Sequence, residues 1–249
     1  MKEKEILEYD FEIPNRDVDI NKALKLSALF AYFQDIACEH ASIIGPTIDI
    51  LSSEYRVAWI LMRMRVEIDR LPSIYEKVKV STWPIGENVL FDRDYTITDK
   101  DGKKIVKSAS TWILMDLDKR ELVKKRPFDF IPMNLWEERA LNVKPLKIKL
   151  PGEPIYQFEK IISFSDLDYN MHLNNAKYLD YISDSLDLET HQNFDVKVID
   201  INYSNEARLG DKLTVNKLIS GEDANIVFVE GRSNDLSLFN SRLELKEKS

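Results

Sequence analysis

The sequence predicts an α+β protein built from two copies of one module, each a helix followed by a run of antiparallel strands. The first observation is an internal repeat: the segment 17–24 (DVDINKAL) returns as 166–173 (DLDYNMHL), with the acids, the Asn and the final Leu in register. A second match aligns 66–80 with 201–215. The second observation is the hydrophobic pattern, which changes from a helical period to a period of two after each copy of the motif. A duplicated module bears on both the fold and the position of any site.

Each copy opens with an amphipathic helix. In the first copy, apolar residues recur with helical spacing from Leu26 to Ile44, and Gly45-Pro46 follows as a stop signal. In the second copy, a shorter apolar stripe runs from Tyr178 to Leu186. It starts after 174–175, two asparagines that are suited to the first turn of a helix.

Short segments of alternating polarity follow each helix and predict strands. They cover 62–68, 78–83, 91–98 and 105–115 in the first copy, and 196–203, 213–220, 226–230 and 236–245 in the second. Each half is therefore expected to be one helix and a meander of four or five strands. The stretch 119–154 has five prolines and little periodicity, which predicts a boundary. We assign residues 1–130 to an N-terminal module, 131–154 to a linker and 155–249 to a C-terminal module.

The composition is that of a globular protein, with 44% hydrophobic and 31% charged residues. The formal net charge of −8 disfavours nucleic acid as a partner. No apolar run approaches the roughly 20 residues of a membrane-spanning helix, and the first residues lack the apolar core of a signal peptide. With Cys38 as the single cysteine, these features predict a protein of the reducing cytoplasm.

Several common catalytic signatures are absent from the sequence. It has no glycine-rich nucleotide loop, no G-x-S-x-G elbow and no H-E-x-x-H zinc motif. Residues 166–170 begin like a calcium loop, but Met171 and Lys177 stand where that loop needs Gly and Glu. We therefore predict neither these three chemistries nor EF-hand calcium binding.

The segment Asp168-Tyr-Asn170-Met-His172 is the strongest candidate for chemistry. Alternate residues of an extended segment point to one side, so the three polar side chains are expected to converge just before a helix. An imidazole moves protons near neutral pH, an amide can donate to an oxyanion, and a carboxylate can orient the imidazole. An equally open alternative is that Asx residues here only cap the helix and form a turn.

The first copy bears on these two interpretations. It keeps Asp19 and Asn21 but has Ala23 in place of His172. The acids and the amide are thus expected to shape the turn in both copies, whereas the histidine is an addition in one.

Four other residues have side chains that could take part in catalysis. Glu206, at the end of a strand, is a further catalytic candidate, although its position alone favours a solvated turn residue. His40 lies on the apolar stripe of the first helix and is expected in the core or a pocket wall, whereas His191 is expected to be exposed. Cys38 is expected to be a small buried hydrophobe rather than a nucleophile.

Aromatic and basic residues are distributed unevenly. All four tryptophans (Trp59, Trp83, Trp112 and Trp136) precede the second copy, which favours an N-terminal half that holds an apolar ligand and a C-terminal half that carries the chemistry. The densest basic run, at 119–126, could dock an acidic partner, although a solvated loop is slightly favoured.

Taken together, these segments resemble the acyl-ACP thioesterases. The resemblance rests on 59–68 (WILMRMRVEI), 82–84 (TWP) and 165–178 (SDLDYNMHLNNAKY), and it covers nearly the whole chain from about Tyr9. It implies a tandem hot-dog fold, in which each module is a long helix wrapped by an antiparallel sheet. It also implies hydrolysis of fatty acyl thioesters of acyl carrier protein in fatty acid biosynthesis, without a metal or cofactor.

By position, the resemblance implies a catalytic group of Asp168, Asn170, His172 and Glu206; the last matches an acid that the family places after a Tyr-x-x motif. Plant members carry a cysteine directly after that acid, and Ala207 here excludes a cysteine acyl-enzyme at that position. The residues expected to bind the substrate or its carrier are Trp59, Arg63, Trp83, Asn174, Asn175, Lys124, Lys125 and Arg126.

We expect His172 and Glu206 to activate a water, Asn170 to orient the thioester or its oxyanion, and Asp168 to position the group. Direct attack by Asp168 through an anhydride is the alternative. The acidic carrier protein is expected on the basic surface at 124–126. Two other functions stay open: a hot-dog thioesterase for acyl-CoA and a non-catalytic acyl-binding or carrier-docking module. The plastid transit segment of plant members is missing, which favours a bacterial, cytoplasmic version, and a homodimer stays open.

Overall fold

The computed structural model describes residues 5–85, 90–129 and 138–248. In the N-terminal half the elements are β1 (Leu7–Glu12), the 3₁₀ turn η2 (Asn15–Asp17), α1 (Leu26–Ile44), α2 (Ile48–Ser53), β2 (Val57–Ile68), β3 (Lys77–Ile85), β4 (Phe91–Thr98) and β5 (Lys104–Asp116). In the C-terminal half they are β6 (Ile155–Ile161), η3 (Phe164–Asp166), α3 (Lys177–Asp184), α4 (Leu188–Asn193), β7 (Phe194–Tyr203), β8 (Lys212–Ile219), β9 (Ile226–Ser233) and β10 (Leu236–Glu247). Both halves have the same order of elements, so the predicted α+β class and its repeat are confirmed.

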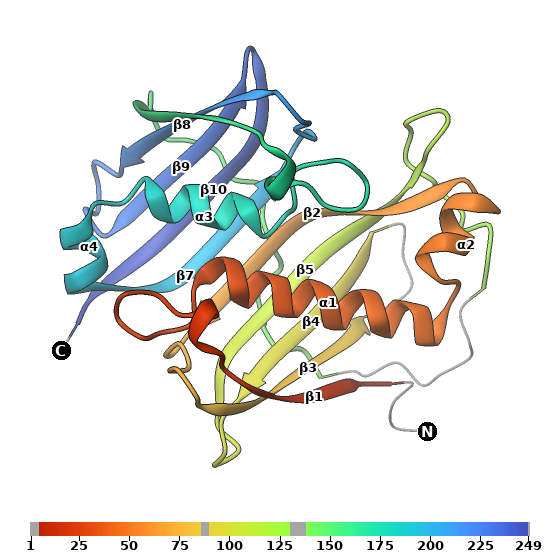
Figure 1. Cartoon of the computed structure of the whole chain (residues 1–249), viewed down its shortest axis with the longest axis horizontal. Coiled ribbons are helices and arrows are strands. Elements are labelled where there is room, and N and C mark those ends of the chain that lie inside the picture. The colour runs from red at the N-terminus through yellow and green to blue at the C-terminus, as the bar shows by residue number, and fades with distance from the viewer. Residues whose placement is uncertain (1–4, 86–89, 130–137, 249) are drawn as a thin grey trace.

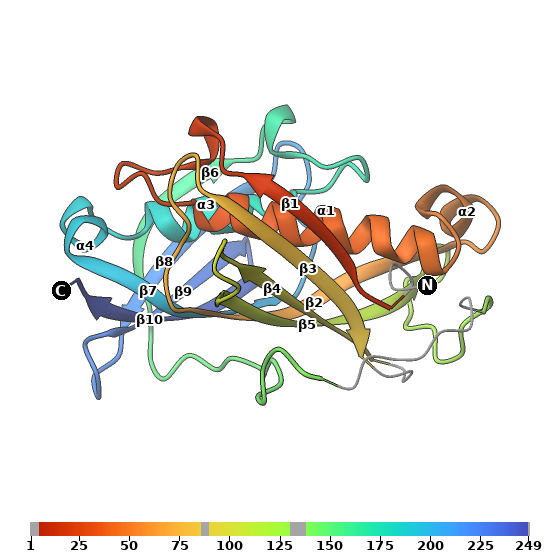
Figure 2. The ribbon, with the colours of Figure 1, turned by 90° about the horizontal axis from the view of Figure 1, so that it is seen from below.

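Within the described residues, the strands form one antiparallel sheet in the order β1-β3-β4-β5-β2-β7-β10-β9-β8-β6. The two halves therefore join at β2 and β7, in the middle of the sheet. Helices α1 and α3 contact each other and lie on one face of it (Figures 1 and 2). Residues 138–154, which precede β6, run along the opposite face (Figure 2).

The prediction of a simple meander was wrong for the first strand after each helix. β2 pairs with β5 rather than β3, and β7 pairs with β10 rather than β8. The β2–β3 connection, 69–76, contains Pro72 and is longer than the two to five residues usual in hairpins, so it carries the chain across the end of the sheet instead of turning back. Only the last three strands of each half form a meander.

Two strands, β1 and β6, were not predicted. They precede the helix of each half and form the two outer edges of the sheet. In β6, Ile155, Tyr156 and Ile161 are all exposed, so the strand lacks the alternation that predicts a half-buried strand.

Helix α1 begins at Leu26 and ends at Ile44, as predicted, with the Gly45 N–H donating to Ala41 O. Its buried stripe packs on the sheet, where the Phe33 ring lies 4.8 Å from that of Tyr95 on β4. Helix α3 has eight residues, whereas α1 has 19. Because α3 is shorter, only the C-terminal part of α1 and helix α2 cover the N-terminal half of the sheet at that end. No helix in the described part of the chain has the length and apolarity to span a membrane.

Candidate active site

The three polar residues at 168–172 lie on a tight turn rather than on the extended segment that we predicted. The Asp168 N–H donates to His172 O at 2.8 Å, and Met171 adopts a left-handed conformation with φ 63°. Asp168 Oδ1 accepts the backbone N–H groups of Asn170 and His172 at 2.8 and 3.2 Å. The Asp168 carboxylate thus accepts N–H groups that have no backbone carbonyl to pair with in such a tight turn. The reversal of the chain brings the side chains of the segment together.

The first copy contains the same turn. Asp19 Oδ1 accepts the N–H groups of Asn21 and Ala23 at 2.8 and 3.1 Å, and Lys22 is left-handed with φ 60°. The aspartate therefore shapes the turn in both copies. What the second copy adds is the imidazole of His172, because the equivalent Ala23 has no functional group.

His172 contacts Glu206, which lies in the β7–β8 connection (204–211) and is far from the histidine in sequence. The His172 Nε2 to Glu206 Oε2 distance is 3.3 Å, and about a fifth to a quarter of each side chain is exposed (21% and 24%). Backbone hydrogen bonds hold the connection around Glu206: Ser204 N–H donates to Leu238 O, and Leu173 N–H donates to Ala207 O. The sequence-distant acid and imidazole are thus adjacent in the fold.

Arg120 also reaches this acid. Its guanidinium forms an ion pair with the Glu206 carboxylate, on the same oxygen that faces His172. Sequence reasoning placed Arg120 only in the basic run and missed this contact, because the residue comes from the turn after β5 in the other half of the chain. Nothing in the local sequence indicates where that turn points.

A cavity of about 580 Å³ opens beside these residues. The N-terminal half supplies apolar walls from α1, α2, β2 and β5, whereas the C-terminal half supplies the 168–175 segment and the 203–206 segment. The four predicted catalytic residues all line it. Figure 1 shows the loop that leads into α3 lying over β2, where the two halves meet. The apolar lining includes Leu51, Val57, Trp59, Ile60, Leu61 and Trp112.

Two tyrosines that the sequence did not indicate complete the wall. Tyr178 and Tyr203 line the cavity with their rings 5.5 Å apart. Burial raises the pKa of both phenols well above the ordinary value, so they stay neutral and serve as hydrogen-bonding groups. The Tyr203 hydroxyl donates to Asn175 O at 3.1 Å. Asn175 itself lines the cavity, which is where we predicted it.

Of the eight residues predicted to bind the substrate or its carrier, Trp59 and Asn175 line the cavity and the other six do not. Trp83 is buried elsewhere and donates its indole N–H to Glu138 O at 2.9 Å. Asn174 Oδ1 accepts the Ala176 N–H at 2.9 Å and so orders the entry to α3. Arg63 alternates on β2 with the core residue Met64, which places it on the side of the sheet away from the helices.

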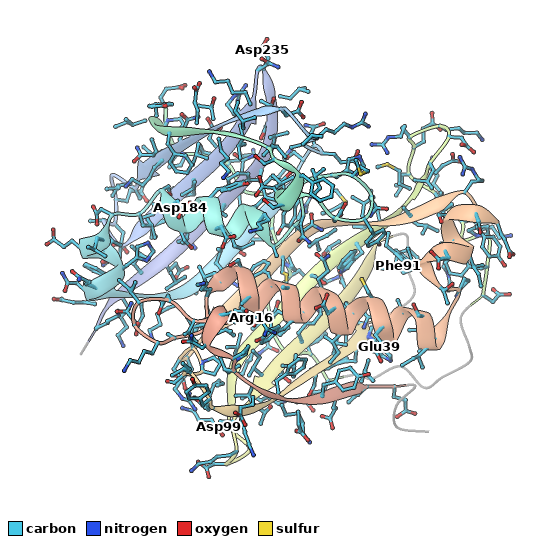
Figure 3. All side chains as sticks on the ribbon, viewed as in Figure 1. Arg16, Glu39, Phe91, Asp99, Asp184 and Asp235 are labelled. Carbon is cyan, nitrogen blue, oxygen red and sulfur yellow. The ribbon has the colours of Figure 1, made fainter. Side chains whose placement is uncertain are left out.

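The basic segment has two kinds of residue. Lys124 and Lys125 are exposed, whereas the half-buried Arg126 places its guanidinium 5.9 Å from the centre of the Phe91 ring. Figure 3 labels Phe91 at the start of β4, where the Trp59 ring packs edge-on against it at 4.7 Å. Trp136 lies outside the described residues.

The remaining candidates behave largely as predicted. Cys38 lines the cavity, but burial raises the pKa of its thiol, which keeps it protonated and poorly nucleophilic. His40 is fully buried, and its Nδ1 lies 3.0 Å from the Arg93 guanidinium. His191 is half-buried rather than exposed, because its Nε2 lies 2.9 Å from Ser183 O.

Comparison with known proteins bears on the fold and the family of this chain. The family model described as the acyl-ACP thioesterase N-terminal domain matches residues 4–127, and that of the C-terminal domain matches 157–235. A solved acyl-ACP thioesterase from Bacteroides thetaiotaomicron is 28% identical, with a TM-score of 0.88 over 99% of this chain and 100% of that one. The 12:0-ACP thioesterase from Umbellularia californica shares the fold, with a TM-score of 0.80 and 19% identity over 98% of each chain. The predicted tandem hot-dog fold is therefore confirmed.

Curated relatives agree with these matches. Oleoyl-acyl carrier protein thioesterase 2 of Arabidopsis thaliana is 26% identical over 95% of this chain and 69% of its own length. For the oleoyl-acyl carrier protein thioesterase of Coriandrum sativum, the chain spans 60% of the relative's length at 26% identity. The two family models together match well over half of the sequence. The chain belongs to the acyl-ACP thioesterase family, a family of thioester hydrolases.

Proposed function

We propose that this protein hydrolyses the thioester between a fatty acyl chain and acyl carrier protein, in fatty acid biosynthesis. The observation that carries the proposal is the His172 imidazole, 3.3 Å from Glu206, at an apolar cavity of about 580 Å³. A histidine paired with an acid beside an apolar cavity suits attack on a carbonyl that ends a hydrocarbon chain. Membership of the family supports the carrier protein as the thiol partner.

In the proposed reaction, His172 takes a proton from a water while the water oxygen bonds to the carbonyl carbon. The side-chain amide of Asn170 donates to the oxyanion that forms. The C–S bond then breaks, and the imidazolium returns its proton to the departing sulfur. Glu206 stabilises the imidazolium between these steps. One water is consumed, and the products are the free fatty acid and the carrier thiol.

The two halves have different parts in this proposal. We assign the acyl chain to the N-terminal module (1–130) because α1, α2, β2 and β5 supply the apolar walls. We assign the chemistry to the C-terminal module (155–249), which supplies His172 and Glu206. The described residues of the linker, 138–154, do not line the cavity.

The carrier protein is expected to dock at Lys124 and Lys125. These exposed lysines follow Arg120, which lines the cavity, and an acidic carrier complements them in charge. Arg126 is a weaker candidate than we predicted, because its guanidinium packs over the Phe91 ring.

Charge reversal tests both the carrier and its docking surface. Lys124→Glu/Lys125→Glu is expected to raise KM for an acyl-ACP by about tenfold, because the encounter loses its electrostatic steering, and to leave turnover of the same acyl chain on CoA nearly unchanged. The matched control is Lys147→Glu/Lys149→Glu. It makes the same change of charge beside Ile148, whose N–H is held by Asn202 on the opposite face of the sheet.

Equal effects on both carriers, or the same effect from the control, would contradict docking at these lysines. A wild-type enzyme that turns over acyl-CoA faster than acyl-ACP would favour the alternative acyl-CoA thioesterase. A homodimer and a cytoplasmic location stay predictions, the second supported by the single free cysteine, Cys38.

A further inference from the structure

Arg120 stands in an unusual backbone conformation at the turn that follows β5. Its φ is 57°, in the left-handed region where glycine is the residue without strain. The turn is closed by Asp116, whose carbonyl accepts the Arg120 N–H at 2.9 Å and whose N–H donates to Glu121 O at 2.9 Å. Arginine is therefore less favourable than glycine for the turn itself.

The Arg120 side chain contacts Glu206, in the other half of the chain. About half of the Arg120 side chain is exposed (47%), and ion pairs this exposed contribute little to stability. The ion pair is therefore expected to add little to the free energy of unfolding, and stability alone does not explain an arginine at this position. Both residues line the cavity, and the guanidinium and the His172 imidazole share one oxygen of Glu206.

The Glu206 side chain needs such a partner. Its backbone is fixed by hydrogen bonds on either side, but a glutamate has three rotatable bonds between that backbone and its carboxylate. The distance from Glu206 Oε2 to His172 Nε2 is 3.3 Å, slightly longer than a normal hydrogen bond, so the imidazole alone holds it weakly. A guanidinium presents several N–H donors in a planar fork and can hold a carboxylate in one orientation.

We propose that Arg120 is a positioning residue for the thioester hydrolysis, a residue of the acyl-binding half that holds the Glu206 carboxylate against the His172 imidazole. The inference rests on the proposed function. It makes the catalytic group dependent on both halves of the chain, because the acid of one is oriented by a cation of the other.

A double-mutant cycle tests this proposal. The variants are Arg120→Gln, Glu206→Gln and the double variant, assayed on a short acyl N-acetylcysteamine thioester, which has neither a carrier protein nor a phosphate to dock. Arg120→Gln is expected to lower kcat by roughly 10- to 100-fold with KM unchanged, since small misplacements of a catalytic group have effects of that size. In the Glu206→Gln background the same change is expected to alter kcat by about twofold at most, because the group that it positions is gone.

Chemical rescue and a matched control accompany the cycle. Guanidinium ion added to Arg120→Gly is expected to restore part of kcat, and Arg120→Lys is expected to retain part of it. The control, Asp118→Asn, breaks the exposed Arg56–Asp118 pair of the same turn and is expected to keep wild-type kcat. Melting temperatures of all variants establish that each is folded, and Arg120→Gly is expected to melt no lower than wild type because glycine suits φ 57°.

Equal losses in both backgrounds would overturn the proposal, since Arg120 would then act independently of Glu206. So would an effect on KM alone, which would assign Arg120 to substrate binding, or wild-type kcat in Arg120→Gln when Glu206→Gln is impaired. Failure of the proposed function has a different result: a wild-type enzyme that releases no thiol, or a Glu206→Gln variant as active as wild type, refutes the catalytic assignment and the positioning role with it.

Discussion

Asp168 and His172 occupy one turn but differ in how their side chains are engaged. Asp168 Oδ1 accepts two backbone N–H groups, as Asp19 does in the first copy, where no catalysis is assigned. Hydrogen bonds of this kind stabilise the carboxylate and make it a poorer nucleophile. Both residues line the cavity, but the imidazole of His172 contacts the Glu206 carboxylate. At the scale of single residues, this difference favours water attack over an anhydride on Asp168.

Isotope labelling tests for an anhydride on Asp168 that is hydrolysed at the aspartyl carbonyl. After a single turnover in ¹⁸O-labelled water, we expect the label in the released fatty acid and none in the Asp168 carboxylate, which peptide mass spectrometry can measure. Label in the Asp168 side chain would show that an anhydride formed and was hydrolysed at the aspartyl carbonyl.

Part of this site could be predicted from the sequence because its residues are close together in the chain. The D-x-N-x-H spacing lies within one turn, so local chemistry brings Asp168, Asn170 and His172 together. The approach of Glu206 and Arg120 depends on where β5 and β7 end, and strand register cannot be read from either segment alone. The same limit explains Trp83, whose residue type suggested a pocket wall but whose strand places it against Glu138.

At the scale of elements, β9 contains a close approach that requires glycine. Gly231 lies opposite Phe239 on β10, and a Cβ at this position would overlap the Phe239 ring and come within 3.0 Å of Leu213 Cδ1. Phe239 is fully buried and contacts the Tyr178 ring at 5.3 Å, so it has little room to move. The glycine thus allows the aromatic ring that supports α3 beside the cavity.

Gly231→Ala is therefore expected to lower the free energy of unfolding by about 1–3 kcal/mol, the usual range for an overpacked core. The control is Gly221→Ala, where a Cβ would meet nothing within 4 Å, and its effect is expected to stay within about 0.5 kcal/mol. Denaturant titration measures both. Equal stabilities of the two variants would show that Phe239 can rearrange freely.

Among the secondary-structure elements, the long helix was predicted accurately and the two edge strands were not predicted at all. The long helix α1 has a continuous apolar stripe and a stop signal, and both of its ends were predicted. The edge strand β6 pairs on one side only and leaves most of its side chains exposed, so hydrophobic alternation could not reveal it. The sheet order also lay beyond the pattern, because periodicity identifies strands but does not say which of them pair.

In the whole molecule, the two halves are related by a pseudo-twofold axis that passes between β2 and β7. The residues that face each other at this axis are not identical. The antiparallel β2–β7 pairing sets Arg65 directly opposite Asp200, and the repeat makes these two residues equivalent. Their side chains form an ion pair of 2.7 Å, mostly buried. A symmetric dimer of identical modules would place the same residue on both sides of its axis. Fusion of two modules into one chain allows a cation to face an anion there.

Restoring symmetry at this axis is expected to destabilise the protein. Asp200→Arg places two guanidinium groups opposite each other and is expected to lower the free energy of unfolding by about 2–3 kcal/mol, somewhat less than the loss of one partner of a fully buried pair. The swap Arg65→Asp/Asp200→Arg is expected to recover most of that loss. A swap that is no more stable than Asp200→Arg would show that the pair does not hold the two halves together.

We propose that the fused pair of modules has one catalytic centre, at His172. The most direct test is the release of free thiol from acyl-ACP thioesters of C8 to C18 chains, with wild type, His172→Ala and the control His191→Ala, which alters a histidine away from the cavity. We expect turnover by wild type and by His191→Ala, and a loss of roughly 10²- to 10⁴-fold in His172→Ala with its melting temperature unchanged. Equal turnover by His172→Ala would contradict the catalytic role of His172, and no turnover by wild type on any chain would favour a protein that binds acyl groups without hydrolysing them.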